Sequence, residues 1–292
     1  MARRRPPTVH GVCIVDKPAG VTSHDVVQEL RRRLGERRVG HAGTPDPDAT
    51  GVLVVAVGLA TRLLTFVSGQ EKTYTAEIVL GVETDTLDAA GSVTARHDMG
   101  PVDLAETREV VASNLTGEIM QVPPMVSALR VDGRRLHELA REGIEVEREA
   151  RPVTVHRFDV IDEVAPGVLS VSVTCSAGTY IRSLASDLGR LLGGGAHLRN
   201  LRRTAIGSFT EERADGPESC PLLPIATAVE HLEAVSVDAD TAARVRLGQV
   251  LERFDGNGPW AVSGPDGELL AVYEVFRDRG VKPAVVLATG DR

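Results

Sequence analysis

Alternating apolar and polar residues predict several β-strands along this chain. The segment 168–176 is the clearest, because serine or threonine separates each of its apolar residues Leu169, Val171, Val173 and Cys175. A period of two places successive side chains on opposite faces of a sheet, so one face of this strand is expected to be buried. Other segments rich in apolar and β-branched residues predict strands at 11–17, 52–57, 72–80 and 152–164.

A different spacing predicts helices. In the segment 22–35, four apolar residues fall on one helical face (Val26, Val27, Leu30 and Leu34). We expect Ser23 to cap the start of this helix and Gly35 to end it. Similar patterns predict helices at 59–66, 103–115, 133–143 and 181–195.

The character of the sequence changes at the proline-rich segment 215–224. Before it, strands interleave with helices, which predicts an α/β fold built on a mixed (α+β) sheet. After it come short strands and Gly/Pro turns, including a hairpin expected around 265–267. The sequence therefore predicts two domains: a larger one at 8–222, long enough to form a catalytic domain, and a small β-rich one at 234–292.

The composition describes a folded, acidic chain. Of 292 residues, 42% are hydrophobic and the net charge is −8. These values exclude a disordered chain and argue against attraction of the whole surface to nucleic acid. Only three of the 33 basic residues are lysines, and arginines cluster at 31–33, 37–38, 134–135 and 199–203. The clusters have two interpretations: exposed helix faces in an arginine-preferring protein, which composition alone favours, or a basic cleft that binds phosphate.

The cysteines and the apolar runs indicate no disulfide, zinc site or membrane segment. Cys13, Cys175 and Cys220 form no C-x-x-C pair, and the first two lie in apolar or alternating stretches typical of core thiols. The apolar part of the N-terminal segment is too short for a secretory signal, and the run 51–60 is too short to span a bilayer. We expect a cytoplasmic protein without membrane contact.

The segment 37–58, "RRVGHAGTPDPDATGVLVVAVG", carries the strongest candidate chemistry. In it Asp46 and Asp48 flank Pro47. A turn explains aspartate and proline, which both favour turns. It does not explain the adjacent arginines, the glycines and His41. An anionic substrate that carries a nucleobase would suit this segment. Its carboxylate lies beside an arginine, an imidazole and glycines that permit close approach.

The letters "DPDAT" also match the D-x-D-x-T loop of aspartate-based phosphotransferases, which depend on Mg²⁺. That chemistry needs the loop at the carboxyl end of an apolar strand. Here the apolar strand follows the aspartates instead of preceding them. A metal-dependent phosphotransferase is therefore an alternative whose activity would require Mg²⁺ and would be lost in EDTA.

The loop belongs to a series of segments that match a known pattern. "GHAGTPDPDATGVL" is similar to the GHxGTLDPxATGxL signature of bacterial tRNA pseudouridine-55 synthases, the TruB family. Five further segments match in the expected order: "DKPAGVTSHDVV", "KTYTAEIVLGVETDTLDAAG", "QVPPMVSALRVDGRRLHELAREG", "CSAGTYIRSLASDLG" and "HLRNLRRTAIGSF". The likeness covers roughly residues 10–210, and ordered motifs over that length are far more specific than one short match.

The resemblance implies three catalytic residues. Asp46 would be the nucleophile, Arg182 would pair with it and orient it, and Tyr74 would stack against a uracil flipped out of the RNA. An arginine nearby would lower the pKa of Asp46, whereas Asp48 would raise it if it faced the same space. We therefore expect Asp48 to point away.

Five more residues are implied to bind substrate or RNA. Tyr180 and Leu201 would contact the substrate, and His41 would help to fill the space that the flipped base leaves. Lys17 and Lys72 lie in matching motifs and are expected to meet RNA phosphates.

The implied activity is isomerisation of uridine to pseudouridine at position 55 in the T-loop of tRNA, by base flipping and without a cofactor or metal. The partner would be the T-arm stem-loop, and we expect a monomer without an obligate protein partner. Whether Asp46 attacks C1′, attacks the pyrimidine ring or aids elimination at C2′ is left open. The C-terminal segment resembles, more weakly, the PUA modules of RNA-modifying enzymes.

The sequence also departs from the family pattern. Pro45 stands where leucine is usual, and Asp48 stands where an apolar residue is usual. A tRNA-binding folding chaperone that has lost catalysis through these changes is a second hypothesis. Nearby, Asp85 and Asp88 could suggest a cation site, but "TDTLDAAG" is more typical of turn hydrogen bonds.

Overall fold

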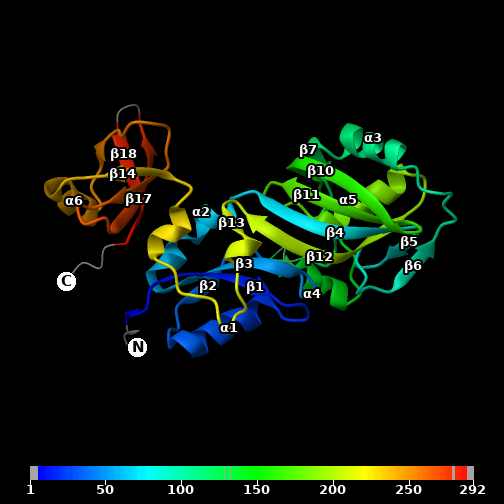
Figure 1. Ribbon diagram of the computed structural model, residues 1–292, viewed down its shortest axis with the longest axis horizontal. Coiled ribbons are helices and arrows are strands. Elements are labelled where there is room, and N and C mark those ends of the chain that lie inside the picture. The colour runs from blue at the N-terminus through cyan, green and yellow to red at the C-terminus, as the bar shows by residue number, and fades with distance from the viewer. Residues whose placement is uncertain (1–5, 128, 132, 278–279, 288–292) are drawn as a thin grey trace.

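A mixed sheet of nine strands forms the larger part of the protein (Figure 1). The computed structural model describes residues 6–127, 129–131, 133–277 and 280–287, and the counts here refer to them. The strands are β1 (Gly11–Lys17), β2 (Val39–His41), β3 (Thr50–Val57), β4 (Lys72–Leu80), β7 (Gly117–Gln121), β10 (Arg151–Ala165), β11 (Val168–Cys175), β12 (Ala196–Ile206) and β13 (Phe209–Thr210). Their order is β1-β3-β12-β4-β11-β10-β7, with β2 beside β3 and β13 beside β12. The pair β3–β12 is parallel, which confirms the predicted mixed sheet.

Helices and two short hairpins surround this sheet. The α-helices here are α1 (Ser23–Leu34), α2 (Leu64–Ser68), α3 (Leu104–Asn114), α4 (Leu136–Arg141) and α5 (Ile181–Leu191), whereas α6 (Ala239–Arg246) lies beside the C-terminal strands (Figure 1). The 3₁₀ turns are η1 (Gly58–Leu63), η2 (Glu211–Arg213) and η3 (Ile225–Val229). The hairpins pair β5 (Val82–Thr84) with β6 (Val93–Arg96), and β8 (Arg130–Val131) with β9 (Arg134–Arg135).

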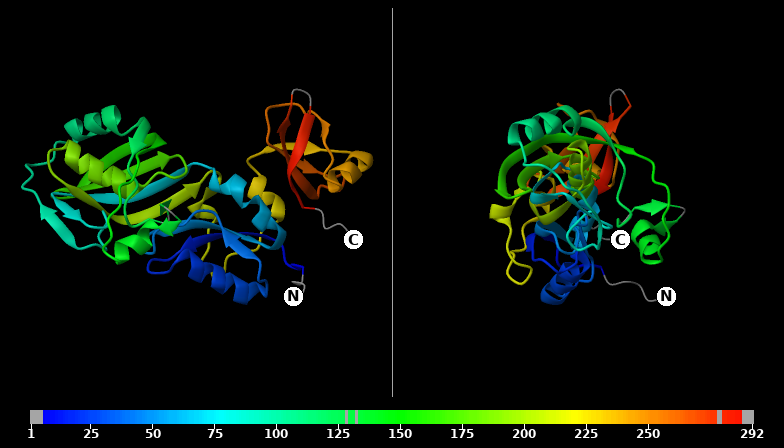
Figure 2. Two further views of the ribbon diagram at one scale, coloured as in Figure 1. Left: turned by 180° about the vertical axis from the view of Figure 1, so that it is seen from behind. Right: turned by 90° about the vertical axis from the view of Figure 1, so that its right-hand side faces the viewer.

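A second, smaller sheet follows the proline-rich segment (Figures 1 and 2). Its strands are β14 (Glu233–Ser236), β15 (Leu251–Glu252), β16 (Trp260–Ser263), β17 (Leu269–Phe276) and β18 (Gly280–Val286). Strands β16 and β17 form the hairpin expected around 265–267. Leu269 and Val272 of this sheet share a buried apolar cluster with Val229 of η3 and Leu63 of η1.

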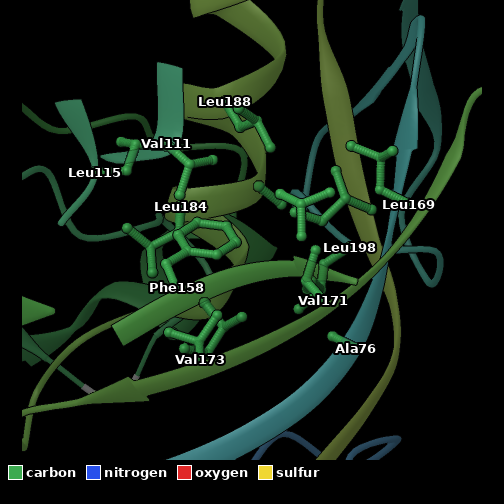
Figure 3. Packing of buried hydrophobic residues seen from close by; sticks show 14 of the residues in the cluster. Ala76, Val111, Leu115, Phe158, Leu169, Val171, Val173, Leu184, Leu188 and Leu198 are labelled. Carbon is green, nitrogen blue, oxygen red and sulfur yellow. The ribbon is translucent and has the colours of Figure 1, made fainter. Parts of the chain in front are cut away.

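The largest apolar cluster lies between the long sheet and helices α3 and α5 (Figure 3). Leu184 and Leu188 of α5 pack against sheet residues that include Phe158 and Val171. All four apolar residues of the alternating segment 168–175 are buried, so the predicted inward face is confirmed. The packing fixes α5 against the sheet, and the first turn of α5 carries Arg182.

The start of α1 differs from the sequence prediction. Thr22, not Ser23, is the N-cap: its hydroxyl accepts a hydrogen bond from the Asp25 amide, and the Asp25 carboxylate accepts one from the Thr22 amide. Ser23 fails as a cap because it is already the first helical residue and its side chain is buried. The expected end is confirmed, since Gly35 adopts a left-handed conformation with φ of 63°.

Strands β3 and β12 approach each other so closely that only glycine fits at one position. A Cβ atom on Gly51 would lie 2.2 Å from the carbonyl oxygen of Arg203, and its φ is +97°. Arg203 in turn lies opposite Tyr74 of β4. The glycine therefore lets β3, β12 and β4 bring these side chains to the end of the loop that carries Asp46.

Strand β12 has two bulges relative to β4, and the first lies between Arg199 and Arg202. Arg199 pairs with Glu77 and Arg202 with Thr75, so three steps on β12 match two on β4. Asn200, inside this bulge, has a left-handed backbone with φ of 53°.

No helix in the described part of the chain is both long enough and apolar enough to cross a membrane.

Replacing Leu184 by alanine tests the packing that holds α5. Leu184 is fully buried in the largest cluster, so Leu184→Ala should lower the free energy of unfolding by about 2–5 kcal/mol. The matched control is Leu191→Ala at the exposed end of the same helix, which should cost less than about 1 kcal/mol. Urea unfolding measures both, and equal losses would contradict the packing described.

Candidate active site

Asp46 lies in the loop between β2 and β3, and Lys17 holds that loop in place. The Lys17 ammonium donates hydrogen bonds to the carbonyl oxygens of Pro47 at 2.7 Å, Val21 at 2.6 Å and Pro18 at 2.9 Å. The amide of Gly20 also donates to the Pro47 carbonyl, at 3.1 Å. The backbone beside Asp46 is thereby tied to the end of β1.

Arg182 pairs with Asp46 across a long sequence separation. Its Nη2 atom lies 2.9 Å from Oδ1 of Asp46. The same guanidinium donates to the carbonyl oxygens of Thr86 at 3.0 Å and Val126 at 2.9 Å. Because Arg182 is only 3% exposed and its partners come from three segments, its position is fixed before any ligand binds.

A second carboxylate, Asp88, also contacts Arg182. Its Oδ2 lies 3.4 Å from Nη1 of the arginine, while its Oδ1 accepts hydrogen bonds from the Thr86 hydroxyl and the Ala90 amide. The turn hydrogen bonds predicted for this segment are confirmed. The ion pair to Arg182 was not predicted, because only the fold brings the turn to the start of α5.

The ionisation of Asp46 depends on opposing effects. Burial raises its pKa above the ordinary value, the charge of Arg182 lowers it, and the charges of Asp88 and Asp48 raise it. Asp48 itself is exposed and forms no ion pair with Arg182. Its charge is still felt at Asp46, and the expectation that it points away stays a prediction.

Tyr74 and Arg203 face the same region from neighbouring strands. Tyr74 is half-buried in β4, directly opposite Arg203 of β12. Burial raises the pKa of the Tyr74 hydroxyl, and the charge of Arg203 opposes that rise. Arg203 is 2% exposed and donates from Nε to the carbonyl of Val52 at 2.7 Å, while its buried Nη2 has no acceptor among the described residues. Sequence reasoning missed Arg203, although it lies in a matching motif.

Three other predicted residues lie on elements that border this region. His41 ends β2 and its Nδ1 forms a hydrogen bond of 2.8 Å with the carbonyl of Gly43, inside the Asp46 loop. Tyr180 is the N-cap residue of α5. The Gln121 side chain accepts a hydrogen bond from the Tyr180 amide and donates one to the Tyr180 carbonyl. Leu201 lies in the β12 bulge and packs at the edge of the largest apolar cluster.

The geometry argues against the phosphate contacts expected of Lys17 and Lys72. Lys17 is fully buried, and its three donated hydrogen bonds go to carbonyl oxygens. Lys72 is 7% exposed and donates to the carbonyls of Ser68 and Gln70. Burial lowers its pKa to about 8. The expectation is corrected because both amines are committed to the backbone and lie away from solvent.

The arginine cluster at 199–203 serves the fold. Arg199 pairs with Glu77 at 2.6 Å, and Arg202 forms ion pairs with Asp16 and Glu211. This cluster fits neither interpretation left open for the arginines, because Arg199 and Arg202 lie on a strand and are paired with carboxylates.

The arrangement offers a carboxylate, Asp46, that is paired with Arg182 and whose charge is felt at the Tyr74 hydroxyl. The described residues contain no group of three or more His, Cys, Asp or Glu side chains placed to share a metal ion. Asp46 precedes its apolar strand, as the sequence indicated. These features suit a carboxylate that attacks an uncharged electrophilic atom of a planar substrate.

Family models match most of the chain. A model described as TruB family pseudouridylate synthase (N terminal domain) matches residues 31–181. A model described as tRNA pseudouridylate synthase B C-terminal domain matches 182–215, and one described as tRNA pseudouridine synthase II, C terminal, matches 232–288.

Curated relatives are similar over nearly the full length. A protein of Thermobifida fusca is 47% identical over 95% of this chain and 98% of its own, and one of Arthrobacter sp. is 46% identical over 95% and 96%. Both carry the name tRNA pseudouridine synthase B.

Solved structures share the fold. One described as the structure of an H/ACA RNP bound to a substrate RNA containing 2′-deoxyuridine has a TM-score of 0.72 at 26% identity, covering 96% of this chain and 86% of that one. A Cbf5-Nop10-Gar1 complex gives 0.73 at 27% identity, covering 95% and 85%.

Removing the Arg182 charge should make Asp46 harder to ionise. Burial already raises the pKa of Asp46 and Arg182 opposes it, so Arg182→Met should raise that pKa further. The ¹³C shift of the Asp46 carboxyl, followed against pH, measures it. As a control, Asp48→Asn removes a charge that raises the pKa and should give a smaller shift in the opposite direction. An unchanged pKa in Arg182→Met would show that the ion pair does not control Asp46.

Proposed function

Because this chain belongs to the TruB family of pseudouridylate synthases, we propose that Asp46 is the residue with which it isomerises uridine in tRNA. The chain is a tRNA pseudouridine synthase, an enzyme of the isomerase class. The contact that carries the assignment of Asp46 is its 2.9 Å ion pair with Arg182, which joins two family motifs from distant parts of the sequence.

The reaction explains why so few groups are needed. The bond between N1 of uracil and C1′ of ribose breaks, the uracil rotates, and C5 bonds to C1′. Substrate and product are isomers, so no electrons are gained or lost overall and no cofactor is needed. The target base must first leave its stack, which costs a few kcal/mol.

Asp46 must be ionised to act as a nucleophile. Its partly buried position raises its pKa, and the Arg182 guanidinium offsets this effect. The other hydrogen bonds of Arg182 to the carbonyls of Thr86 and Val126 keep the guanidinium in place as charge on Asp46 is consumed.

We assign Tyr74 to the flipped base. An aromatic ring stacked on a base contributes about 1–3 kcal/mol, enough to offset much of the lost stacking. Arg203, buried opposite Tyr74 on the neighbouring strand, holds positive charge next to the Tyr74 hydroxyl. Leu201 and Tyr180 complete the pocket, and His41 fills the space that the base vacates.

The resemblance to the family supports a more specific substrate, location and division into domains. We propose that the target is position 55 in the T-arm of tRNA, and that the enzyme works in the cytoplasm as a monomer without cofactor or obligate protein partner. We also propose that residues 8–222 form the catalytic domain and that residues 234–292 form a PUA-like RNA-binding domain.

The alternatives are less well supported by the geometry. An aspartyl phosphotransferase would direct its carboxylate at a metal-bound phosphate, whereas Asp46 is paired with an arginine. A chaperone that had lost catalysis through Pro45 and Asp48 would not require this pair. Asp48 is exposed, so a polar residue there does not disturb the interior.

Replacing Asp46 by asparagine should abolish pseudouridine formation. The amide is nearly isosteric but is a poor nucleophile, so an unmodified tRNA transcript should give no product above background while its Kd changes less than about threefold. Asp48→Asn, the matched control in the same loop, should retain activity. Product is measured chemically as pseudouridine. Pseudouridine formation by Asp46→Asn would overturn the assignment of Asp46, and none by well-folded wild-type enzyme would favour the chaperone hypothesis.

Lys17→Met separates a loop anchor from a phosphate ligand. The three carbonyls that Lys17 holds would lose their donor, so the loop of Asp46 should shift and kcat should fall at least about tenfold. The tRNA Kd and its salt dependence should barely change. A phosphate ligand would instead weaken binding and reduce the salt slope by roughly one. Arg157→Met, which removes an exposed positive charge from β10 outside the small sheet, is the control for net charge.

A further inference from the structure

Cys13 and Cys220 meet in the interior far from the Asp46 site. Cys13 lies in β1, and Cys220 lies in the segment 215–224 that leads toward the small sheet, here called the connector. Both are at most 1% exposed. Nη2 of Arg33 lies 3.3 Å from Sγ of Cys220 and 3.9 Å from Sγ of Cys13, and both cysteines belong to one buried cluster. Two sulfur atoms are thus gathered around one guanidinium nitrogen.

Arg33 favours ionisation of one thiol of this pair. It comes from the last turn of α1 and also donates from Nη2 to the carbonyl of Cys220 at 2.6 Å. Among the described residues it forms no ion pair with a carboxylate, and its buried Nε has no acceptor. A partly buried cation without a counter-ion favours a nearby anion, and the nearest group able to become one is the Cys220 thiol.

The two thiols are not equivalent. The hydrogen bond from Cys13 and the charge of Arg33 lower the pKa of Cys220 to about 7, while the same hydrogen bond raises the pKa of Cys13. The third cysteine, Cys175, lies in β11, where burial raises its pKa to about 11. Cys220 is therefore the thiol most easily ionised, and Cys13 is the thiol beside it.

Only a thin layer of chain covers the pair. Glu218, Ser219 and Pro221, on either side of Cys220, are exposed. The turn is closed by hydrogen bonds from the amides of Ser219 and Cys220 to the carbonyl of Gly216. Opening this one turn would give a small oxidant access, and local openings of that size occur at much lower free energy than global unfolding.

We propose that Cys13 and Cys220 form a disulfide when the protein meets a peroxide. The Cys220 thiolate attacks a peroxide oxygen, the O–O bond breaks, and hydroxide leaves and takes up a proton, so that Cys220 becomes a sulfenic acid. The Cys13 sulfur then attacks that sulfur, and its proton leaves with the hydroxyl group as water. In total two thiols lose two electrons and two protons to hydrogen peroxide, which becomes two waters. The site is independent of the proposed function.

The test treats the full-length native protein with a small molar excess of hydrogen peroxide. Intact mass should fall by the mass of two hydrogen atoms, and a digest without reductant should yield one linked peptide pair containing Cys13 and Cys220. Dithiothreitol should restore the original mass. Cys175 should remain reduced and be alkylated as in untreated protein.

Variants separate the roles of the three residues. Cys13→Ser should leave Cys220 as a sulfenic acid that a dimedone-type probe captures, and Cys220→Ser should leave Cys13 unreacted. Arg33→Met should slow cross-linking at least about tenfold. Cys175→Ser, the matched control, should cross-link at the wild-type rate. Three reduced thiols after native oxidation, a link through Cys175, or an unchanged rate in Arg33→Met would each overturn the proposal.

Discussion

One buried guanidinium organises the proposed active site of this enzyme. Arg182 enters at the first turn of α5 and meets Asp46, Asp88 and two backbone carbonyls from separate segments. A buried charge must be paired and hydrogen-bonded or it destabilises the fold. The folded chain satisfies Arg182 only when the catalytic loop, the turn that contains Asp88 and the segment at Val126 are all in place. The interaction that ionises Asp46 is therefore also one that joins the parts of the site.

Local patterns predicted much of the fold, because they report on local physics. Alternation gave β11 and its buried face, and a left-handed glycine ended α1 as expected. The N-cap moved by one residue because Thr22 and Ser23 are equally good caps and only the capping box with Asp25 distinguishes them. The order of strands, which places β12 between β3 and β4, depends on pairings between distant residues that no local pattern contains.

The residues of the candidate site could also be predicted only in part. Motif resemblance indicated Asp46, Tyr74 and Arg182, and the first and last of these are in contact. Resemblance gave the wrong environment for Lys17 and Lys72, because a motif shows that a residue matters but not whether it faces solvent or backbone. Both amines lie under the surface and bind carbonyls. Asp88 and Arg203 were missed for a related reason, since their significance arises from what the fold places beside them.

The first bulge in β12 affects both the ion pairs of the fold and the proposed site, because it sets the face of the sheet on which each later side chain lies. In a regular strand each step reverses the face on which a side chain lies, so the extra residue at Asn200 decides which of Arg202 and Arg203 faces Tyr74. Arg202 meets Asp16 and Glu211 on its own face, while Arg203 is buried beside Val52. One further residue that entered regular pairing there would leave the first half of the strand in register and place Arg202, instead of Arg203, opposite Tyr74. This segment is therefore sensitive to insertions, whatever residue is inserted.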